Sequence, residues 1–252
     1  YIYSYSSDAI TPVSVTMPIR VESWISKDLH PIFQMNLPEG SLKEIIRERF
    51  AKIQYMDDLG FLKLIGPYVI GRVKYGLPSN NEEPITLDSI LKNDTHELFE
   101  KLMDRFAIRS GISGIQPKML MQIQDKNTLT TEEYIVKSWG EEYPELAFNE
   151  FFCMEAVRFA DLPVPDYKLS ENRSMFIMKR FDLKDDGSFL GFEDGCVLLG
   201  KGTDDKYYSS YEDLAKAHKA KNQPEKRQES LKRVFKALVV DHIMLKGQGL
   251  IK

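Results

Sequence analysis

The chain has 252 residues, of which 34 are Lys or Arg and 38 are Asp or Glu, giving a net charge of -4. This balance excludes an overall positive field that would attract nucleic acid or an acidic membrane, so such a contact requires a local patch. With 42% hydrophobic and 29% charged residues, the composition is that of a soluble globular protein, and the length fits one large or two small domains.

Targeting and redox features are few. No run of 18 apolar residues and no signal-peptide order occurs, so we expect a cytoplasmic protein without membrane association. The first residue is Tyr1 rather than Met, which suggests that the true beginning is missing. Cys153 and Cys196 have apolar neighbours and no metal-ligand spacing, so we predict buried free thiols and no metal site.

Residues 1–76 are predicted to form a compact α+β module. Short β-type stretches such as 13–19 (VSVTMPI) alternate with turn residues up to position 40. A helix follows, with Ser41 and Glu44 at capping-box spacing and one apolar face. The glycine-punctuated run 60–75 favours short strands, and the polar stretch 76–84 (GLPSNNEEP) has the composition of a linker.

Beyond this linker the expected elements are longer. Residues 115–125 and 133–139 predict the two strands of a hairpin, which carry Lys118 and Lys137. An apolar segment that starts at Pro144 predicts a well-buried helix carrying Glu150. Residues 174–182 predict another strand, and a last helix has an apolar face between positions 231 and 245.

The stretch SGISGIQPK, residues 110–118, allows two interpretations. A glycine-rich turn exposes backbone N–H groups that can bind phosphate, and Lys118 adds positive charge. It is not a Walker A loop, because the required spacing is absent and a strand, rather than a helix, is expected next. Alternatively, its glycines only supply the positive φ angles of an ordinary hairpin.

Lys137 and Glu150 form a second candidate site. Lys137 follows apolar residues on its strand, and Glu150 lies within the apolar circumference of the next helix. A buried carboxylate needs a partner, and a strand lysine paired with a helix glutamate is the arrangement found in protein kinases. Alternatively, the lysine reaches solvent at a sheet edge and the glutamate bridges at the surface. In MKRFD (178–182), Phe181 is either a contact for a flat base or a core residue.

The chain resembles the HipA-type serine/threonine kinases of bacterial toxin–antitoxin systems. Seven segments occur in the family's order and together span nearly the whole chain: LPEG, SGISGIQPK, YIVKSW, NEFFCMEAVRFADLPVPDYKL, MKRF, LLGKGTDDKY and SYEDLAK. The resemblance implies an α+β, bilobed, protein-kinase-like fold with an extra N-terminal α/β subdomain. It places that subdomain at 1–76, the kinase N-lobe at 85–180 and the start of a helical C-lobe, incomplete here, at 181–252.

The same resemblance implies cofactors and partners. ATP and Mg²⁺ are the expected cofactors. The expected substrate is an aminoacyl-tRNA synthetase, commonly the glutamyl enzyme, whose phosphorylation halts translation and promotes dormancy. The expected partner is a HipB-type DNA-binding antitoxin, through which the complex reaches operator DNA.

By position in the sequence, the resemblance implies that Lys137 is the ATP-anchoring lysine and that Glu150 is the helix carboxylate of the family. It also implies that Lys179 to Phe181 form the adenine-contacting hinge. The phosphate loop corresponds to Gly111, Ile112, Ser113, Gly114, Gln116 and Lys118. Members of the family switch themselves off by phosphorylating a serine in this loop. Gly111 occupies the usual position of that serine, which leaves Ser113, with Ser110 second, as the candidates.

The end of the chain departs from the family pattern. After the last helix the family carries N-x-D-x-H-x-x-N-F, whose Asp accepts the substrate proton and whose Asn holds magnesium. This sequence has KGQGLIK instead, so no catalytic Asp or Asn is assigned, and Asp241 is not named as one. Either residues of a complete kinase are omitted, or the chain is a catalytically inactive kinase-fold module that binds the antitoxin as a co-repressor.

Overall fold

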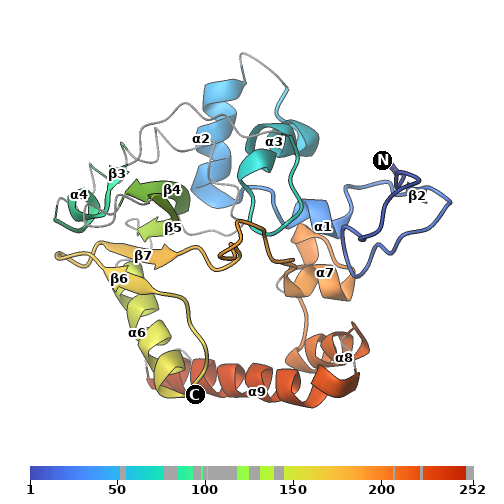
Figure 1. Ribbon diagram of the computed structural model, residues 1–252. Helices are drawn as coiled ribbons and strands as arrows, with labels where there is room; N and C mark the ends of the chain where they lie inside the picture. Colours follow the sequence, from blue (N-terminus) through green and yellow to red (C-terminus); the bar gives the residue numbers. More distant parts are fainter. Residues whose placement is uncertain are drawn as a thin grey trace.

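The computed structural model describes residues 1–51, 55–76, 85–92, 98, 101, 118–124, 131–138, 145–206, 208–221 and 224–247 (Figure 1). The strands are β1 (Ile2–Tyr3), β2 (Trp24–Ile25), β3 (Ile85–Thr86), β4 (Lys118–Gln124), β5 (Thr131–Ser138), β6 (Tyr167–Leu169) and β7 (Met175–Lys179). The helices are α1 (Pro31–Gln34), α2 (Gly40–Phe50), α3 (Asp58–Ile65), η1 (Gly66–Tyr68), α4 (Leu87–Lys92), α6 (Leu146–Phe159), α7 (Gly195–Leu199), η3 (Thr203–Asp205), α8 (Tyr211–Lys221) and α9 (Pro224–Gly247).

A five-stranded sheet with the order β3-β4-β5-β7-β6 organises the described part of the chain. Neighbouring strands are antiparallel except for β3 and β4, which are parallel. The predicted hairpin is confirmed, since β4 pairs with β5 along its whole length and places Lys118 opposite Lys137. The expected mixture of helices and strands is therefore present.

One face of the sheet packs on the N-terminal segment, residues 1–76. Val136 of β5 and its partner Ile177 of β7 point to this face. They join one apolar cluster with Ile46, Phe61 and Ile65 from α2 and α3, all of which are fully buried. Figure 1 shows α2 and α3 on this side of the sheet. Burial of each such side chain contributes about 1.5–3 kcal/mol, so this cluster holds the N-terminal segment on the sheet.

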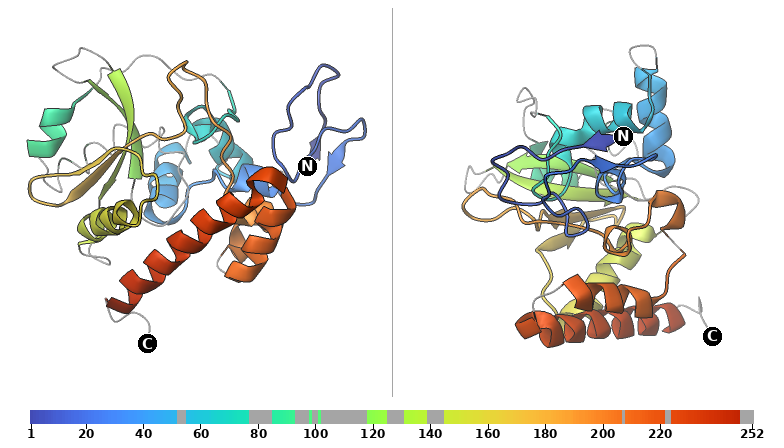
Figure 2. Two further views of the ribbon diagram at one scale, coloured as in Figure 1. Left: turned by 60° about the horizontal axis from the view of Figure 1, so that its bottom comes forward. Right: turned by 90° about the vertical axis from the view of Figure 1, so that its right-hand side faces the viewer.

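The opposite face of the sheet packs on α6. Because successive strand residues alternate between faces, Ile135 and Phe176 point away from the N-terminal helices. They cluster with Met178 and with Ala147 of α6. Figure 2 shows α6 on this side and α9 as a long helix that continues past it to α8, and both helices contact α9.

The prediction of short strands over 60–75 is wrong. Residues 58–65 form α3, and 66–68 form the short helix η1. Asp57 caps α3, because its carboxylate accepts a hydrogen bond of 2.8 Å from the Gly60 N–H. Gly60 lies inside α3 and Gly66 lies at its end, whereas Gly71 lies in a bend after η1.

Two predictions for the first 50 residues also need correction. Residues 13–19 contain only an isolated bridge between Ser14 and Met17 rather than a strand. The predicted helix is present as α2, but it begins one residue earlier, with Glu39 at the N-cap and no side-chain cap bond. Glu44 does not complete a capping box, because its carboxylate is ion-paired with Arg47, 2.7 Å away.

The helix carrying Glu150 is present as α6, but the prediction that it is well buried is wrong. Ala147 is its fully buried residue, whereas Phe159 is 94% exposed. Phe152 and Phe159 line an apolar groove together with Phe235 and Val239 of α9. Cys153 and Cys196 are thiols rather than a disulfide, as predicted, but they are only half-buried. In the described part of the chain, no helix has both the length and the apolarity needed to cross a bilayer.

Close packing at Gly66 allows a test of the packing within the N-terminal segment. A methyl group on Gly66 would meet the Cβ of Tyr75 and lie 2.9 Å from its carbonyl oxygen. We therefore expect Gly66→Ala to lower the free energy of unfolding by about 1–3 kcal/mol, as overpacking does. Gly191→Ala is the matched control, because its methyl group would find Arg72 Nε at an ordinary 3.4 Å. Urea unfolding measures both, and equal losses in the two variants would contradict this packing.

Candidate functional site

Lys137 lies near the end of β5, on the face of the sheet that is covered by α6. Its neighbours Ile135 and Val136 are buried and anchor the strand on both faces. The Lys137 side chain is 17% exposed, and its Nζ lies 5.8 Å from the ring centroid of Phe176, its cross-strand partner. A largely desolvated ammonium group at this place requires an anion.

Glu150 supplies that anion from α6. The Lys137 Nζ donates a hydrogen bond to Glu150 Oε1, and the two side chains form an ion pair with 24% exposure of the carboxylate. The pairing expected from the sequence is therefore confirmed. The lysine has three N–H donors, and the bond to Glu150 uses one of them. The role of this pair in binding ATP stays a prediction.

The predicted phosphate loop is largely outside the described residues. This holds for Gly111, Ile112, Ser113, Gly114 and Gln116, and for the second serine candidate, Ser110. The backbone of Lys118 is described as the first residue of β4, directly opposite Lys137. β4, which follows the predicted loop in the sequence, therefore begins beside Lys137.

The predicted hinge runs from Lys179, the last residue of β7, to Phe181. Lys179 is ion-paired with Glu132 at 2.6 Å, and Phe181 is 40% exposed. The backbone N–H of Lys179 donates to Asp166, and that of Arg180 donates to the carbonyl of Glu133. These two N–H groups are therefore already bonded, whereas the ring of Phe181 is partly exposed.

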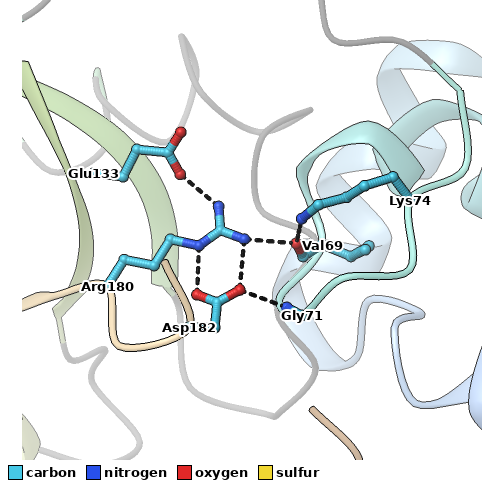
Figure 3. Close-up of polar contacts among 6 residues, drawn as sticks. All are labelled: Val69, Gly71, Lys74, Glu133, Arg180 and Asp182. Atoms are coloured by element: carbon cyan, nitrogen blue, oxygen red, sulfur yellow. Dashed lines mark hydrogen bonds and ion pairs between the residues drawn. The ribbon is translucent and has the colours of Figure 1, made fainter. Parts of the chain in front are cut away.

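Arg180, which lies between Lys179 and Phe181, and Asp182, which follows Phe181, form a charged cluster that the sequence analysis missed. The guanidinium of Arg180 binds Asp182 through two parallel bonds, Nε to Oδ1 at 2.6 Å and Nη2 to Oδ2 at 2.9 Å. It also donates to Glu133 of β5. The side chains of Arg180 and Asp182 are 3% and 1% exposed (Figure 3). Such a planar, bidentate pair is the geometry that arginine forms best.

The same cluster reaches the N-terminal segment. Arg180 Nη2 donates to the carbonyl of Val69 at 3.0 Å, and the N–H of Gly71 donates to Asp182 Oδ2 at 2.6 Å. Lys74 also donates to the Val69 carbonyl, and its Nζ lies 4.2 Å from the ring of Phe189. We call Val69, Gly71, Lys74, Glu133, Arg180 and Asp182 the Arg180 cluster (Figure 3).

The charged groups of the Arg180 cluster shift one another's pKa values. Burial first, and then the nearby Arg180 guanidinium, lower the pKa of Lys74 to about 8, against the opposing effect of Asp182 and Glu133. For Asp182, burial favours the neutral carboxyl, but the bonds and charge of Arg180 and the Gly71 N–H outweigh it and keep the pKa low. The pair is therefore ionised at neutral pH.

A local sequence signal for the Arg180 cluster exists but is weak. Arg180 and Asp182 are two residues apart, directly after the apolar strand β7, so both point to the same side of an extended chain. That spacing predicts a charged pair. It does not predict burial, because the covering residues Val69 and Gly71 are more than 100 positions away in the sequence.

Comparison with known families gives matches to both parts of the chain. Residues 1–76 match the HipA N-terminal domain, and residues 110–247 match the HipA-like C-terminal domain. The second match alone spans more than half of the chain. The chain belongs to the HipA family.

Two individual proteins are similar to parts of this chain. A Haemophilus influenzae protein named "Putative kinase" is 32% identical over 42% of this chain and 36% of its own length. HipA in the Shewanella oneidensis MR-1 complex with HipB and operator DNA has a TM-score of 0.47 and 18% identity, over 74% of this chain and 48% of that one. The chain therefore spans less than half the length of these two proteins.

The depressed pKa of Lys74 predicts a pH dependence of stability in this HipA-family chain. Lys74 titrates at about 8 when folded and at about 10.4 when unfolded, so between these values the unfolded chain binds more protons. The free energy of unfolding of the wild type should therefore rise between about pH 8 and pH 10 relative to Lys74→Met.

Urea unfolding at several pH values measures this difference. Lys63→Met, which removes an exposed lysine of α3, is the control and should keep the pH profile of the wild type. Parallel profiles for the wild type and Lys74→Met would show that Lys74 is not desolvated as described.

Proposed function

We propose that this HipA-family chain carries the nucleotide-binding part of an ATP-dependent protein-serine kinase. The observation that carries the proposal is the ion pair between Lys137 and Glu150, together with the register that sets Lys137 opposite Lys118 at the start of β4. Family membership supports the same assignment.

The described residues include groups that suit the binding of ATP. Glu150 holds the Lys137 ammonium in a fixed, partly desolvated position, where it neutralises phosphate charge better than a mobile surface lysine. Phe181 offers an exposed aromatic ring that fits the flat face of a base. Bound MgATP supplies the transferable γ-phosphoryl group and the positive charge of the metal. No residue of this chain is assigned as catalytic base or magnesium ligand.

The proposed architecture is a bilobed, protein-kinase-like fold. Residues 1–76 form the added N-terminal subdomain, 85–180 form the N-lobe and 181–252 begin the helical C-lobe. In this arrangement Lys179, Phe181 and the backbone between them form the hinge that contacts adenine. Gly111, Ile112, Ser113, Gly114, Gln116 and Lys118 surround the phosphates.

The biological role that we propose is that of a toxin in a toxin–antitoxin module. Its substrate is an aminoacyl-tRNA synthetase, with the glutamyl enzyme as first candidate, and its partner is a HipB-type antitoxin that brings the complex to operator DNA. Phosphorylation of Ser113, or of Ser110, switches the kinase off. These assignments rest on membership of the HipA family.

Replacement of Lys137 tests nucleotide binding directly. We expect Lys137→Ala to weaken MgATP binding by about 10- to 100-fold, since a charge-assisted hydrogen bond contributes about 1.5–3 kcal/mol. Lys168→Ala is the matched control, because Lys168 is an exposed lysine of the same sheet, on β6. Calorimetric titration of the chain measures both affinities. An unchanged affinity in Lys137→Ala would refute the assignment of this lysine.

Phosphoryl transfer requires a second experiment, on the complete gene product. It is incubated with radiolabelled ATP and Mg²⁺, alone and with glutamyl-tRNA synthetase, and the labelled serines are mapped. We expect label on the synthetase and on Ser113 or Ser110. Nucleotide binding without any transfer would instead support an inactive module that binds the antitoxin as a co-repressor.

A further inference from the structure

The segment from Lys179 to Asp182 has two different faces. The side chain of Lys179 is 42% exposed and Phe181 is 40% exposed, whereas Arg180 and Asp182 are buried in the Arg180 cluster. Alternation along an extended chain produces this pattern. One face is therefore open to a ligand, while the other face is bonded to the N-terminal segment.

Gly71 connects the buried face of this segment to Phe192. Its N–H donates to Asp182, and its φ of +88° is in the region that favours glycine. A Cβ at this position would lie 3.0 Å from the Cβ of Phe192. The backbone of the N-terminal segment thus lies directly against Phe192 while it binds Asp182.

Phe192 in turn contacts the exposed face of the segment. Its ring lies edge-on to that of Phe181, with centroids 5.7 Å apart and an interplanar angle of 63°. Edge-to-face packing is a preferred geometry for aromatic pairs. Phe181 is therefore held from two sides, by its backbone next to the Arg180 cluster and by its ring against Phe192.

We propose that Arg180, Asp182 and Phe192 are positioning residues for the base end of the nucleotide site. This inference rests on the proposed function, and it assigns to the N-terminal segment a part in nucleotide binding. The phosphate end is positioned separately, by Lys137 on β5 and Glu150 on α6. A weakened Arg180 cluster should therefore affect contacts with the base and leave contacts with the phosphates intact.

Two ligands separate these effects: MgATP, which has a base, and magnesium tripolyphosphate, which has none. Arg180→Lys keeps one positive charge beside Asp182 but cannot bridge Asp182, Glu133 and Val69 with a planar fork. Arg158→Lys is the matched control, because Arg158 forms an exposed surface pair with Glu155. Calorimetry gives the affinity of each variant for each ligand.

We expect Arg180→Lys to bind MgATP about tenfold more weakly, equivalent to about 1.4 kcal/mol, and to bind tripolyphosphate like the wild type and Arg158→Lys. Equal weakening for both ligands would overturn the inference, because it indicates a general structural role. Unchanged MgATP affinity in the folded variant would also overturn it. Failure of the wild type to bind either ligand would overturn the proposed function, and this inference with it.

A second variant keeps the test decisive if Arg180→Lys does not fold. Phe192→Leu removes the aromatic contact with Phe181 and leaves the buried charges in place. It should show the same selective loss of MgATP affinity, with tripolyphosphate binding retained. A Phe192→Leu chain that binds both ligands like the wild type would refute the role of Phe192 and Arg180 in positioning the base.

Discussion

The buried pair of Arg180 and Asp182 is the interaction on which the arrangement of the chain depends. Removing one partner of such a pair costs about 3–5 kcal/mol, because the other charge is left buried without compensation. Here the pair also binds the backbone at Val69 and Gly71, so it joins the end of β7 to the N-terminal segment. The position of that segment on the sheet is thus fixed by directional bonds as well as by apolar packing.

The proposed site has two ends, and each is held by a different constraint. At one end, the register of β4, β5 and β7 places Lys118, Lys137 and Phe176 side by side, and α6 adds Glu150. At the other end, the Arg180 cluster holds the backbone that carries Phe181. The sheet joins the two ends, because β5 and β7 are paired over this whole region.

Local sequence patterns predicted the strands and the helix that carry Lys137 and Glu150. They did not predict the contacts of the Arg180 cluster. The hairpin followed from the two strand-like runs 115–125 and 133–139. The pairing of Lys137 with Glu150 was one of two alternatives, suggested by a carboxylate on an apolar helix. The run 60–75 was misread because glycine is a breaker in both helices and strands, while the cap at Asp57 and the contact of Gly66 with Tyr75 decide the outcome. No local pattern shows that the Gly71 amide binds Asp182, because this contact depends on the folded arrangement of distant segments.

Hydrogen–deuterium exchange with and without MgATP is the most direct measurement of the central claim, that one nucleotide contacts both ends of this site. The account predicts slower exchange on adding MgATP in peptides covering 131–138 and 175–182, with peptides of α8 unchanged. Binding of MgATP with no change in these two peptides, or with protection confined to other segments, would contradict it.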